Sequence, residues 1–262
     1  MQQHYTATEQ MVVCGARLIK NGDVCYVGIG MPMLATWTAK FTHAPALTAV
    51  YEVGIIRTSP CPLGYALDSL PVQTRSDMLS NFFDVNAMAA NDCFHAGFIG
   101  AGQIDRFGNV NSTVAGSMEQ PRHRWPGSGG ANDITSLCRN VIVILKQNRR
   151  RFPERVDFIT SPGYLDGTAG AREACGLPAY AGPSKVITDL GIYGFEGGEM
   201  VLESVHTHMG VTVDQIRQEV GWNLRVSPQL AETKPPEREY LHVLREEVDP
   251  FGVYQDGKPI VR

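Results

Sequence analysis

A glutamate that follows a short apolar run is the residue best suited to covalent chemistry. Glu52 comes directly after residues 47–51 (Leu-Thr-Ala-Val-Tyr) and precedes Gly54 by two positions. If this run is a buried strand, Glu52 stands at its carboxyl end, where open α/β sheets bind ligands. A carboxylate there can attack an acyl carbonyl while nearby backbone N–H groups stabilise the oxyanion. The structural alternative is that Glu52 caps a helix or pairs with Arg57.

Glycine-rich segments could supply those N–H groups. The run Gly100-Ala101-Gly102-Gln103 continues through Asn109, and small residues let a backbone turn its N–H groups toward an anion or a thioester oxygen. The same residues also favour a β-hairpin with a tight turn at 107–109, and both interpretations can hold. Residues 126–133 lack the Lys-Ser/Thr pair of a Walker loop, and 28–30 (Gly-Ile-Gly) do not extend to a dinucleotide fingerprint, so no bound nucleotide cofactor is predicted.

Three further clusters have residue types that could form sites. His206 and His208 have strand spacing and could face a metal together, but no Cys or acidic residue has matching spacing, so a solvated strand edge is favoured and no metal site is predicted. Cys61 has no nearby His to activate it. The arginines at 149–151 are typical of a solvated face, with a pyrophosphate partner as the alternative.

The order of predicted elements is what would position Glu52. Thr6 and Glu9 form a capping box at the start of a helix that ends near residue 21. A strand at 24–27, a glycine turn, a helix at 33–42 and a strand at 47–51 then indicate a parallel α/β sheet. Further strands are expected at 141–145, 156–160, 185–188, 191–195 and 200–205, a helix from Thr212 to Val220, and a linker at 227–236 that leads to a last helix at 236–248.

Composition excludes several classes of protein. The 262 residues carry 27 acidic and 23 basic side chains, a formal net charge of −4, which gives no field to hold nucleic acid. No apolar run approaches the roughly 18 residues of a membrane span, and the first residues lack a signal peptide, so a cytoplasmic protein with reduced cysteines is expected.

Taken together, the glycine and glutamate segments resemble the B subunit of class I coenzyme A transferases, with the B subunit of glutaconate CoA-transferase the nearest look-alike. The segments that carry the resemblance follow in order along almost the whole chain: 28–32 (Gly-Ile-Gly-Met-Pro), 43–45, 52–54 (Glu-Val-Gly), 98–105, 108–113 (Gly-Asn-Val-Asn-Ser-Thr), 127–132, 150–152, 160–163 (Thr-Ser-Pro-Gly) and 245–250.

The resemblance implies a fold and an assembly. The fold is a single-domain, three-layer α/β fold with a parallel sheet of the NagB/RpiA-like type, over residues 1–262, with 227–262 as C-terminal linker and helix. Such B subunits work with a homologous A subunit, which implies a heterodimer that assembles to a heterotetramer or larger. No permanently bound cofactor is implied; coenzyme A and a carboxylic acid are the substrates.

The resemblance also implies site residues. Glu52 matches the glutamate that attacks an acyl-CoA to give a mixed anhydride and then a glutamyl-CoA thioester. The residues implied for the oxyanion and CoA are Gly28, Gly30, Gly100, Ala101, Gly102, Gln103, Asn109, Gly129 and Gly130.

Two differences from the family pattern bear on which carboxylic acid is the substrate, and less on the reaction that Glu52 performs. The residues beside Glu52 are Tyr51 and Val53 where many members have Ser or Asn, and the order Gly-Ala-Gly at 100–102 replaces Gly-Gly-Ala. The acid is expected to be a dicarboxylate, with His43, Arg57 or Arg75 as guesses for its second carboxylate. The alternatives are an acyl-CoA hydrolase, ring-opening hydrolase or decarboxylase on the same fold, or a non-catalytic binding protein.

Overall fold

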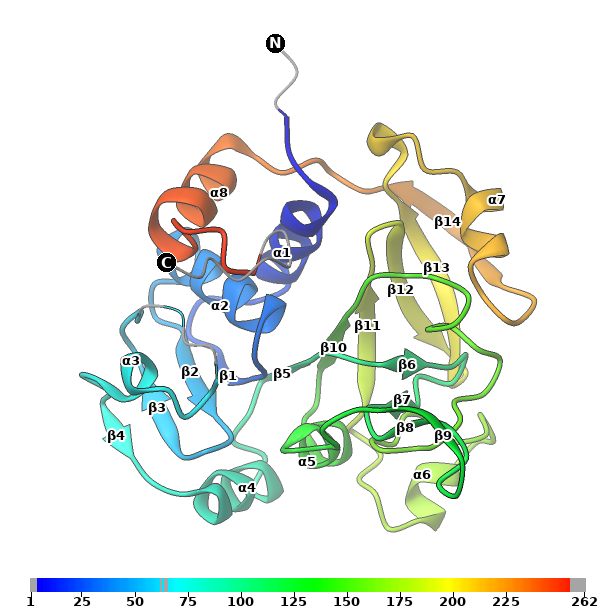
Figure 1. Ribbon diagram of the computed structural model, residues 1–262, viewed down its shortest axis with the longest axis horizontal. Coiled ribbons are helices and arrows are strands. Elements are labelled where there is room, and N and C mark those ends of the chain that lie inside the picture. The colour runs from blue at the N-terminus through cyan, green and yellow to red at the C-terminus, as the bar shows by residue number, and fades with distance from the viewer. Residues whose placement is uncertain (1–3, 62, 64–65, 255–262) are drawn as a thin grey trace. The chain divides into compact units, whose positions relative to one another are not determined.

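The computed structural model describes residues 4–61, 63 and 66–254. Its internal contacts divide the chain into two compact units, one of residues 1–100 and 235–262 and the other of residues 101–234 (Figure 1). The expected single domain stays a prediction.

Three helical segments of the first unit pack together. Helix α1 (Ala7–Arg17) begins with the predicted capping box, since the Thr6 hydroxyl accepts from Glu9 N–H and the Glu9 carboxylate accepts from Thr6 N–H. It contacts α2 (Met31–Phe41) and α8 (Arg238–Val243), which continues as the π-helical turn η2 (Leu244–Val248) (Figure 1). The Arg245 guanidinium donates to the Glu9 carboxylate, which joins the C-terminal turn to α1.

The sheet of the first unit has the order β5-β1-β2-β3-β4 among the residues described. Strand β1 (Val24–Val27) pairs in parallel with β5 (Ala96–Ile99) and with β2 (Thr48–Tyr51), whereas β3 (Ile55–Arg57) and β4 (Met78–Leu79) add antiparallel pairs. The three residues between β2 and β3 are too few for a crossover, so this connection is a hairpin. Helices α3 (Leu70–Gln73) and α4 (Phe82–Ala90) complete the unit.

The second unit holds a mixed sheet and two small hairpins. The strand order is β10 (Val141–Ile144), β11 (Pro183–Ile187), β12 (Gly191–Glu196), β13 (Glu199–Val205) and β14 (Arg225–Glu232). The pairs β10–β11 and β13–β14 are parallel, and the pairs β11–β12 and β12–β13 are antiparallel. The remaining elements of the unit are β6 (Gln103–Ile104), β7 (Val110–Asn111), β8 (Val114–Gly116), β9 (Pro121–Arg124), α5 (Ala131–Leu137), α6 (Ala171–Ala174), η1 (Thr207–Met209) and α7 (Val213–Gln218).

Most predicted elements are confirmed, including the α/β fold with parallel strand pairs, and two expectations are wrong in detail. Short hairpins add antiparallel pairs to the parallel ones, so the sheets are mixed. Residues 156–160 form no strand: Phe158 and Ile159 are exposed, and the nearest backbone pairing is an isolated bridge between Ser161 and Val110. Residues 227–232 are not linker but part of β14.

Strand β14 was not predicted because its sequence is mostly polar. The strand is mostly exposed and includes Pro228, which an edge strand tolerates because its outer N–H groups have no ladder partner. The predicted last helix is present as α8 and η2. Within the described ranges, no helix is both long and apolar enough to cross a bilayer.

Candidate functional site

Glu52 lies in the tight turn that joins β2 to β3. The turn spans Glu52, Val53 and Gly54, and it is closed by a 3.0 Å hydrogen bond from Gly54 N–H to the Tyr51 carbonyl. The Glu52 side chain is half-buried. A short closed turn leaves the carboxylate little backbone freedom, which is what a positioned nucleophile requires.

Gly54 fixes this turn against the start of α4. Its φ of +99° lies in the left-handed region, and a Cβ at this position would sit 2.4 Å from the Asn81 nitrogen and from the Ser80 carbonyl carbon. Ser80 N–H donates to the Gly54 carbonyl at 2.8 Å, and Asn81 caps α4 by accepting from Asp84 N–H. Only glycine fits both the conformation and the approach.

Three of the predicted positions stand at the same edge of the first unit's sheet. Glu52, Gly28 and Gly100 each follow the last residue of β2, β1 and β5, and these three strands are neighbours and parallel. The chain leaves β1 toward β2 on one side and returns as β5 on the other, so this edge is a topological switch point. The structure thus confirms the expected strand-end setting of Glu52.

The glycines beside Glu52's strand allow close backbone approach. Gly28 N–H donates to the Phe98 carbonyl at 2.9 Å, and a Cβ on Gly28 would lie 2.8 Å from that oxygen. Gly30 has φ +80° and is the N-cap of α2, a helix with no acidic residue in its first turn. The positive end of the α2 dipole is therefore available to developing negative charge.

The Arg57 guanidinium is used by the protein backbone, not by Glu52 or by the second carboxylate of a substrate, the two partners that the sequence suggested. It is 2% exposed, and its guanidinium donates to four backbone carbonyls, those of Ser59, Pro60, Val72 and Thr74. It therefore holds the chain between β3 and β4 together. Of the other guesses, His43 bonds the Ile19 carbonyl and the Tyr240 hydroxyl, whereas Arg75 is exposed with a φ of +56°.

An apolar cavity of about 480 Å³ lies in the same unit. Trp37, Cys61 and Val248 contribute to its wall. Both Trp37 and Cys61 lie beside the hydroxyl of Tyr51, the residue before Glu52. Burial raises the pKa of the Cys61 thiol, which agrees with the prediction that Cys61 is not a reactive thiolate.

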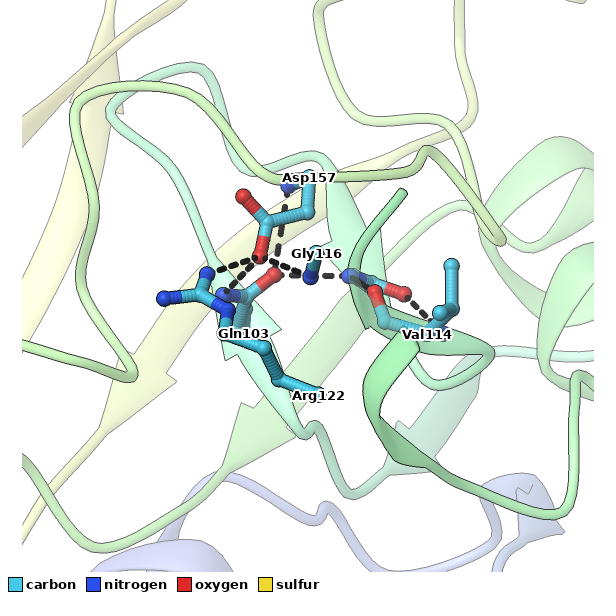
Figure 2. A network of polar contacts seen from close by, with 6 residues as sticks. Gln103, Val114, Gly116, Arg122 and Asp157 are labelled. Atoms are coloured by element: carbon cyan, nitrogen blue, oxygen red, sulfur yellow. Dashed lines mark hydrogen bonds and ion pairs between the residues drawn. The ribbon is translucent and has the colours of Figure 1, made fainter. Parts of the chain in front are cut away.

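In the second unit, Gln103 belongs to a polar network (Figure 2). Its amide donates to Asp157 at 3.1 Å, and its oxygen accepts from the Asn111 amide at 2.6 Å and from Asp157 N–H at 3.2 Å. Asp157 also accepts from Gly116 N–H at 2.8 Å and from Arg122 at 3.2 Å. Burial alone would raise the pKa of Asp157, but these hydrogen bonds and the Arg122 charge outweigh it and hold the pKa below its usual value.

Gly102 and Asn109 have structural duties in this unit. A Cβ on Gly102 would lie 2.6 Å from the Trp125 ring, so only glycine admits the indole. Both amide hydrogens of Asn109 are used, on Asp105 and on the Leu165 carbonyl, and its oxygen accepts from Gly163 and Leu165 N–H. The Asn109 side chain therefore holds the 163–165 loop and has no amide hydrogen left for a ligand. The 103–111 segment is the hairpin expected as the structural alternative.

The last three candidate residues, Ala101, Gly129 and Gly130, lie in the second unit. Ala101 is half-buried just before β6, the exposed Gly129 has φ +49°, and Gly130 is the N-cap of α5. Nothing in the fold tests whether these residues touch coenzyme A, so their ligand roles stay predictions.

The two histidines are not a solvated strand edge. His206 follows β13, is fully buried, and its Nε2 lies 2.9 Å from the Thr188 carbonyl, whereas His208 is in the short helix η1. Burial lowers the pKa of His206 to about 4, so it is neutral near pH 7. No group of three or more His, Cys, Asp or Glu side chains that could hold a metal occurs in the part of the chain described.

Sequence reasoning missed Trp125 and Asp157. Neither has a local motif, and both act through partners about 20 to 50 positions away in the chain, the indole against Gly102 and the carboxylate with Gln103. The only local hint was the interleaving of basic and aromatic residues at 122–125 (Arg-His-Arg-Trp).

Comparison with known proteins identifies the family. A model of the coenzyme A transferase family matches residues 8–219. The B subunit of 3-oxoadipate CoA-transferase from Pseudomonas knackmussii is 38% identical over 92% of each chain, and the B subunit of glutaconate CoA-transferase from Acidaminococcus fermentans is 33% identical over 94% of each.

Solved structures agree with this match. The crystal structure of glutaconate coenzyme A-transferase from A. fermentans has a TM-score of 0.89 at 32% identity, covering 96% of this chain and 97% of that one. The decarboxylase AibA/AibB has a TM-score of 0.82 at 25% identity, over 98% and 99% of the two chains. These matches confirm the resemblance and the α/β fold, and the chain therefore belongs to the coenzyme A transferase family, as a chain of the B-subunit type.

Proposed function

We propose that this chain is the B subunit of an enzyme that transfers CoA from an acyl-CoA to a carboxylic acid through a glutamyl-CoA thioester on Glu52. The observation that carries the proposal is the setting of Glu52: a carboxylate in a closed turn, one residue beyond a parallel strand, at the switch point of its sheet.

The steps conserve atoms and charge. A Glu52 carboxylate oxygen attacks the thioester carbonyl, the tetrahedral oxyanion collapses, and CoA leaves as a thiolate, which gives a mixed anhydride. The thiolate then attacks the Glu52 carbonyl and releases the first acid. The acceptor carboxylate attacks the resulting glutamyl thioester, which forms a second mixed anhydride and releases the CoA thiolate. The thiolate finally attacks the acyl carbonyl of this anhydride, which gives the new acyl-CoA and restores the Glu52 carboxylate.

The oxyanion needs donors that are in place before reaction. The N-terminus of α2 at Gly30 offers N–H groups and a favourable dipole in the same unit as Glu52. Gly28 and Gly100, one residue beyond neighbouring strands, are further candidates for close backbone approach. The resemblance adds Ala101 as a predicted contact of the thioester, and Gly102 and Gln103 as predicted contacts of coenzyme A.

A dicarboxylic acid is the substrate class best supported. The two B subunits compared above are named for glutaconate and 3-oxoadipate, and both are dicarboxylates. The apolar cavity lined by Trp37 and Cys61 could take the carbon chain of such an acid, since its lining is mostly apolar.

A separate A subunit is the proposed partner, in a heterodimer or a larger assembly. Both relatives are named as one subunit of a pair. Five large apolar side chains are exposed within residues 70–83, with exposed fractions of 46–79%: Leu70, Met78, Leu79, Phe82 and Phe83. A monomeric protein rarely exposes so many together. The same segment includes Ser80 and Asn81, which contact the Glu52 turn.

Covalent capture tests the proposal. The chain, co-expressed with its A subunit, is incubated with glutaconyl-CoA, 3-oxoadipyl-CoA or acetyl-CoA, quenched and analysed by intact-protein and peptide mass spectrometry. We expect an adduct of CoA less water on Glu52, converted by hydroxylamine to a hydroxamate. Glu52→Gln should form none, whereas Glu154→Gln, a change at an exposed glutamate of the other unit, should react normally.

The competing function is hydrolysis or decarboxylation of a CoA thioester. It is favoured by one observation, the fold-wide similarity to the decarboxylase AibA/AibB at 25% identity. Release of free CoA or of carbon dioxide at equal rates by the wild type and by Glu52→Gln, with no adduct, would reject the transferase proposal in favour of this one.

A further inference from the structure

A second cavity, of about 620 Å³, lies entirely within the second unit and is strongly basic. Four arginines and one aspartate are among its lining residues: Arg122, Arg149, Arg150, Arg151 and Asp157. Trp125 contributes an aromatic wall. This concentration of positive charge contrasts with the net charge of −4 for the whole chain.

Hydrogen bonds hold the backbone of the three consecutive arginines, residues 149–151, in a defined turn. The Asn148 side-chain oxygen accepts from the N–H groups of Arg150 and Arg151 at 3.1 Å, and Ile104 N–H donates to the Arg151 carbonyl at 2.8 Å. The next residue, Phe152, is fully buried and stacks on Trp222. The backbone therefore holds three consecutive cationic side chains at one edge of the cavity.

These cations are only partly neutralised by the protein. Arg122 is paired with Asp157, and Arg149 donates through Nη1 to the carbonyls of Gln218 and Val220. In the described part of the chain, the Arg150 guanidinium has no hydrogen-bond or ion-pair partner. Like charges gathered on a pocket wall repel one another, and a bound anion would relieve that repulsion.

The geometry also favours a ligand with a flat ring. Gly102 lies against one face of the Trp125 indole, and the His123 ring meets the indole edge-on at 5.0 Å between centroids. The indole is thus held in place beside the arginines. A fixed aromatic face next to guanidinium groups is the combination that binds a nucleobase and its phosphates.

We propose that this cavity binds an adenine nucleotide, with its phosphate groups on Arg122, Arg150 and Arg151 and its base against Trp125. The ligand has two sources: the phosphorylated nucleotide end of coenzyme A, an assignment that rests on the proposed function, or a free nucleotide. Both share the chemistry of an adenine ring with phosphate groups. The volume of the cavity is in the range of small-ligand sites.

A binding experiment tests the proposal without reference to catalysis. The complex of this chain with its A subunit is titrated with adenosine 3′,5′-bisphosphate and with inorganic phosphate, by calorimetry and by quenching of tryptophan fluorescence. We expect saturable binding of the bisphosphate that weakens with added salt. The quenching should disappear in Trp125→Phe, because Trp37 and Trp222 do not line this cavity.

Arg150→Gln is the decisive variant, because the Arg150 side chain makes no polar contact that the described part of the fold would lose. Loss of one charge-assisted contact should weaken bisphosphate binding by about tenfold. The matched control is Arg217→Gln, an exposed arginine of α7 outside the cavity, which should bind like the wild type. Absence of bisphosphate binding at millimolar concentration, or equal affinity in Arg150→Gln and wild type, would overturn the proposal.

Two further measurements identify the source of the nucleotide. If it is coenzyme A, Arg150→Gln raises KM for acyl-CoA with little change in kcat and leaves acyl-pantetheine unaffected. An unchanged KM with weakened bisphosphate binding assigns the site to a free nucleotide. Glu52→Gln should bind the bisphosphate like the wild type, so that failure of covalent capture and failure of this site are told apart.

Discussion

Replacing Gly54 with alanine tests whether the turn geometry positions Glu52. With φ at +99°, a side chain on this residue costs about 1–2 kcal/mol of backbone strain. The new Cβ would also lie 2.4 Å from the backbone at Ser80 and Asn81, and overpacking against atoms that cannot rotate away costs about 1–3 kcal/mol more. We therefore expect Gly54→Ala to lower the free energy of unfolding by about 2–5 kcal/mol.

The same change should impair catalysis beyond its effect on stability. Relief of the clash requires the turn to move by about 1 Å, and a displacement of that size at a reacting group costs roughly hundredfold in rate. The assay is CoA transfer by protein that circular dichroism shows to be folded, together with urea denaturation. In Gly22→Ala the glycine has nearly the same φ, +90°, but a Cβ would meet nothing within 4 Å, so this control carries the strain without the clash. Equal stability and activity in the two variants would refute the reasoning.

Three other outcomes follow from particular contacts. Arg57→Met should lower the free energy of unfolding by about 3 kcal/mol or more in urea denaturation, because four backbone carbonyls lose the buried guanidinium that donates to them; a change under about 1 kcal/mol would contradict that role. Burial would raise the pKa of Glu9, but the hydrogen bonds from Arg245 and Thr6 and the charge of Arg245 together outweigh it and hold the pKa below its usual value of about 4.5. The stabilisation is therefore complete above pH about 4.5 and lost as the pH falls through the lowered value, so the gap in stability between wild type and Glu9→Gln should close on acidification; a gap that is constant with pH would contradict it. Phe83→Ser should reduce co-purification of the A subunit while Phe158→Ser, an exposed apolar change in the other unit, should not; equal yields would remove 70–83 from the interface.

Local signals in the sequence predicted the elements that surround Glu52. The capping box at Thr6 and Glu9, the strand at 24–27 and the strand before Glu52 all depend on neighbours within a few positions, and all are confirmed. The strand-end position of the nucleophile candidate therefore follows from the sequence alone.

Partners distant in the sequence could not be predicted. Arg57 looked like a carboxylate partner because arginine is usually exposed, yet 15 and 17 positions later the chain returns to place the Val72 and Thr74 carbonyls on its guanidinium. Strand spacing suggested a solvated edge for His206, because spacing does not reveal what covers a strand. The polarity of β14 likewise concealed an edge strand, whose pairing depends on β13 and not on its own composition.

Gly54 shows where the boundary lies between these two kinds of inference. A glycine two residues after a strand-end glutamate suggests a turn with positive φ, and the sequence alone supports that much. The requirement for glycine at this position comes from the backbone of Ser80 and Asn81, which leaves no room for a Cβ. These two residues lie against the turn because β4 pairs with β3 and α4 begins shortly after β4. The position of the carboxylate is thus set by a contact across the fold, and the segment that makes this contact carries the exposed apolar side chains of residues 70–83. A partner that binds this segment would contact the residues that hold the Glu52 turn in place, so we expect assembly and the position of the Glu52 carboxylate to be coupled.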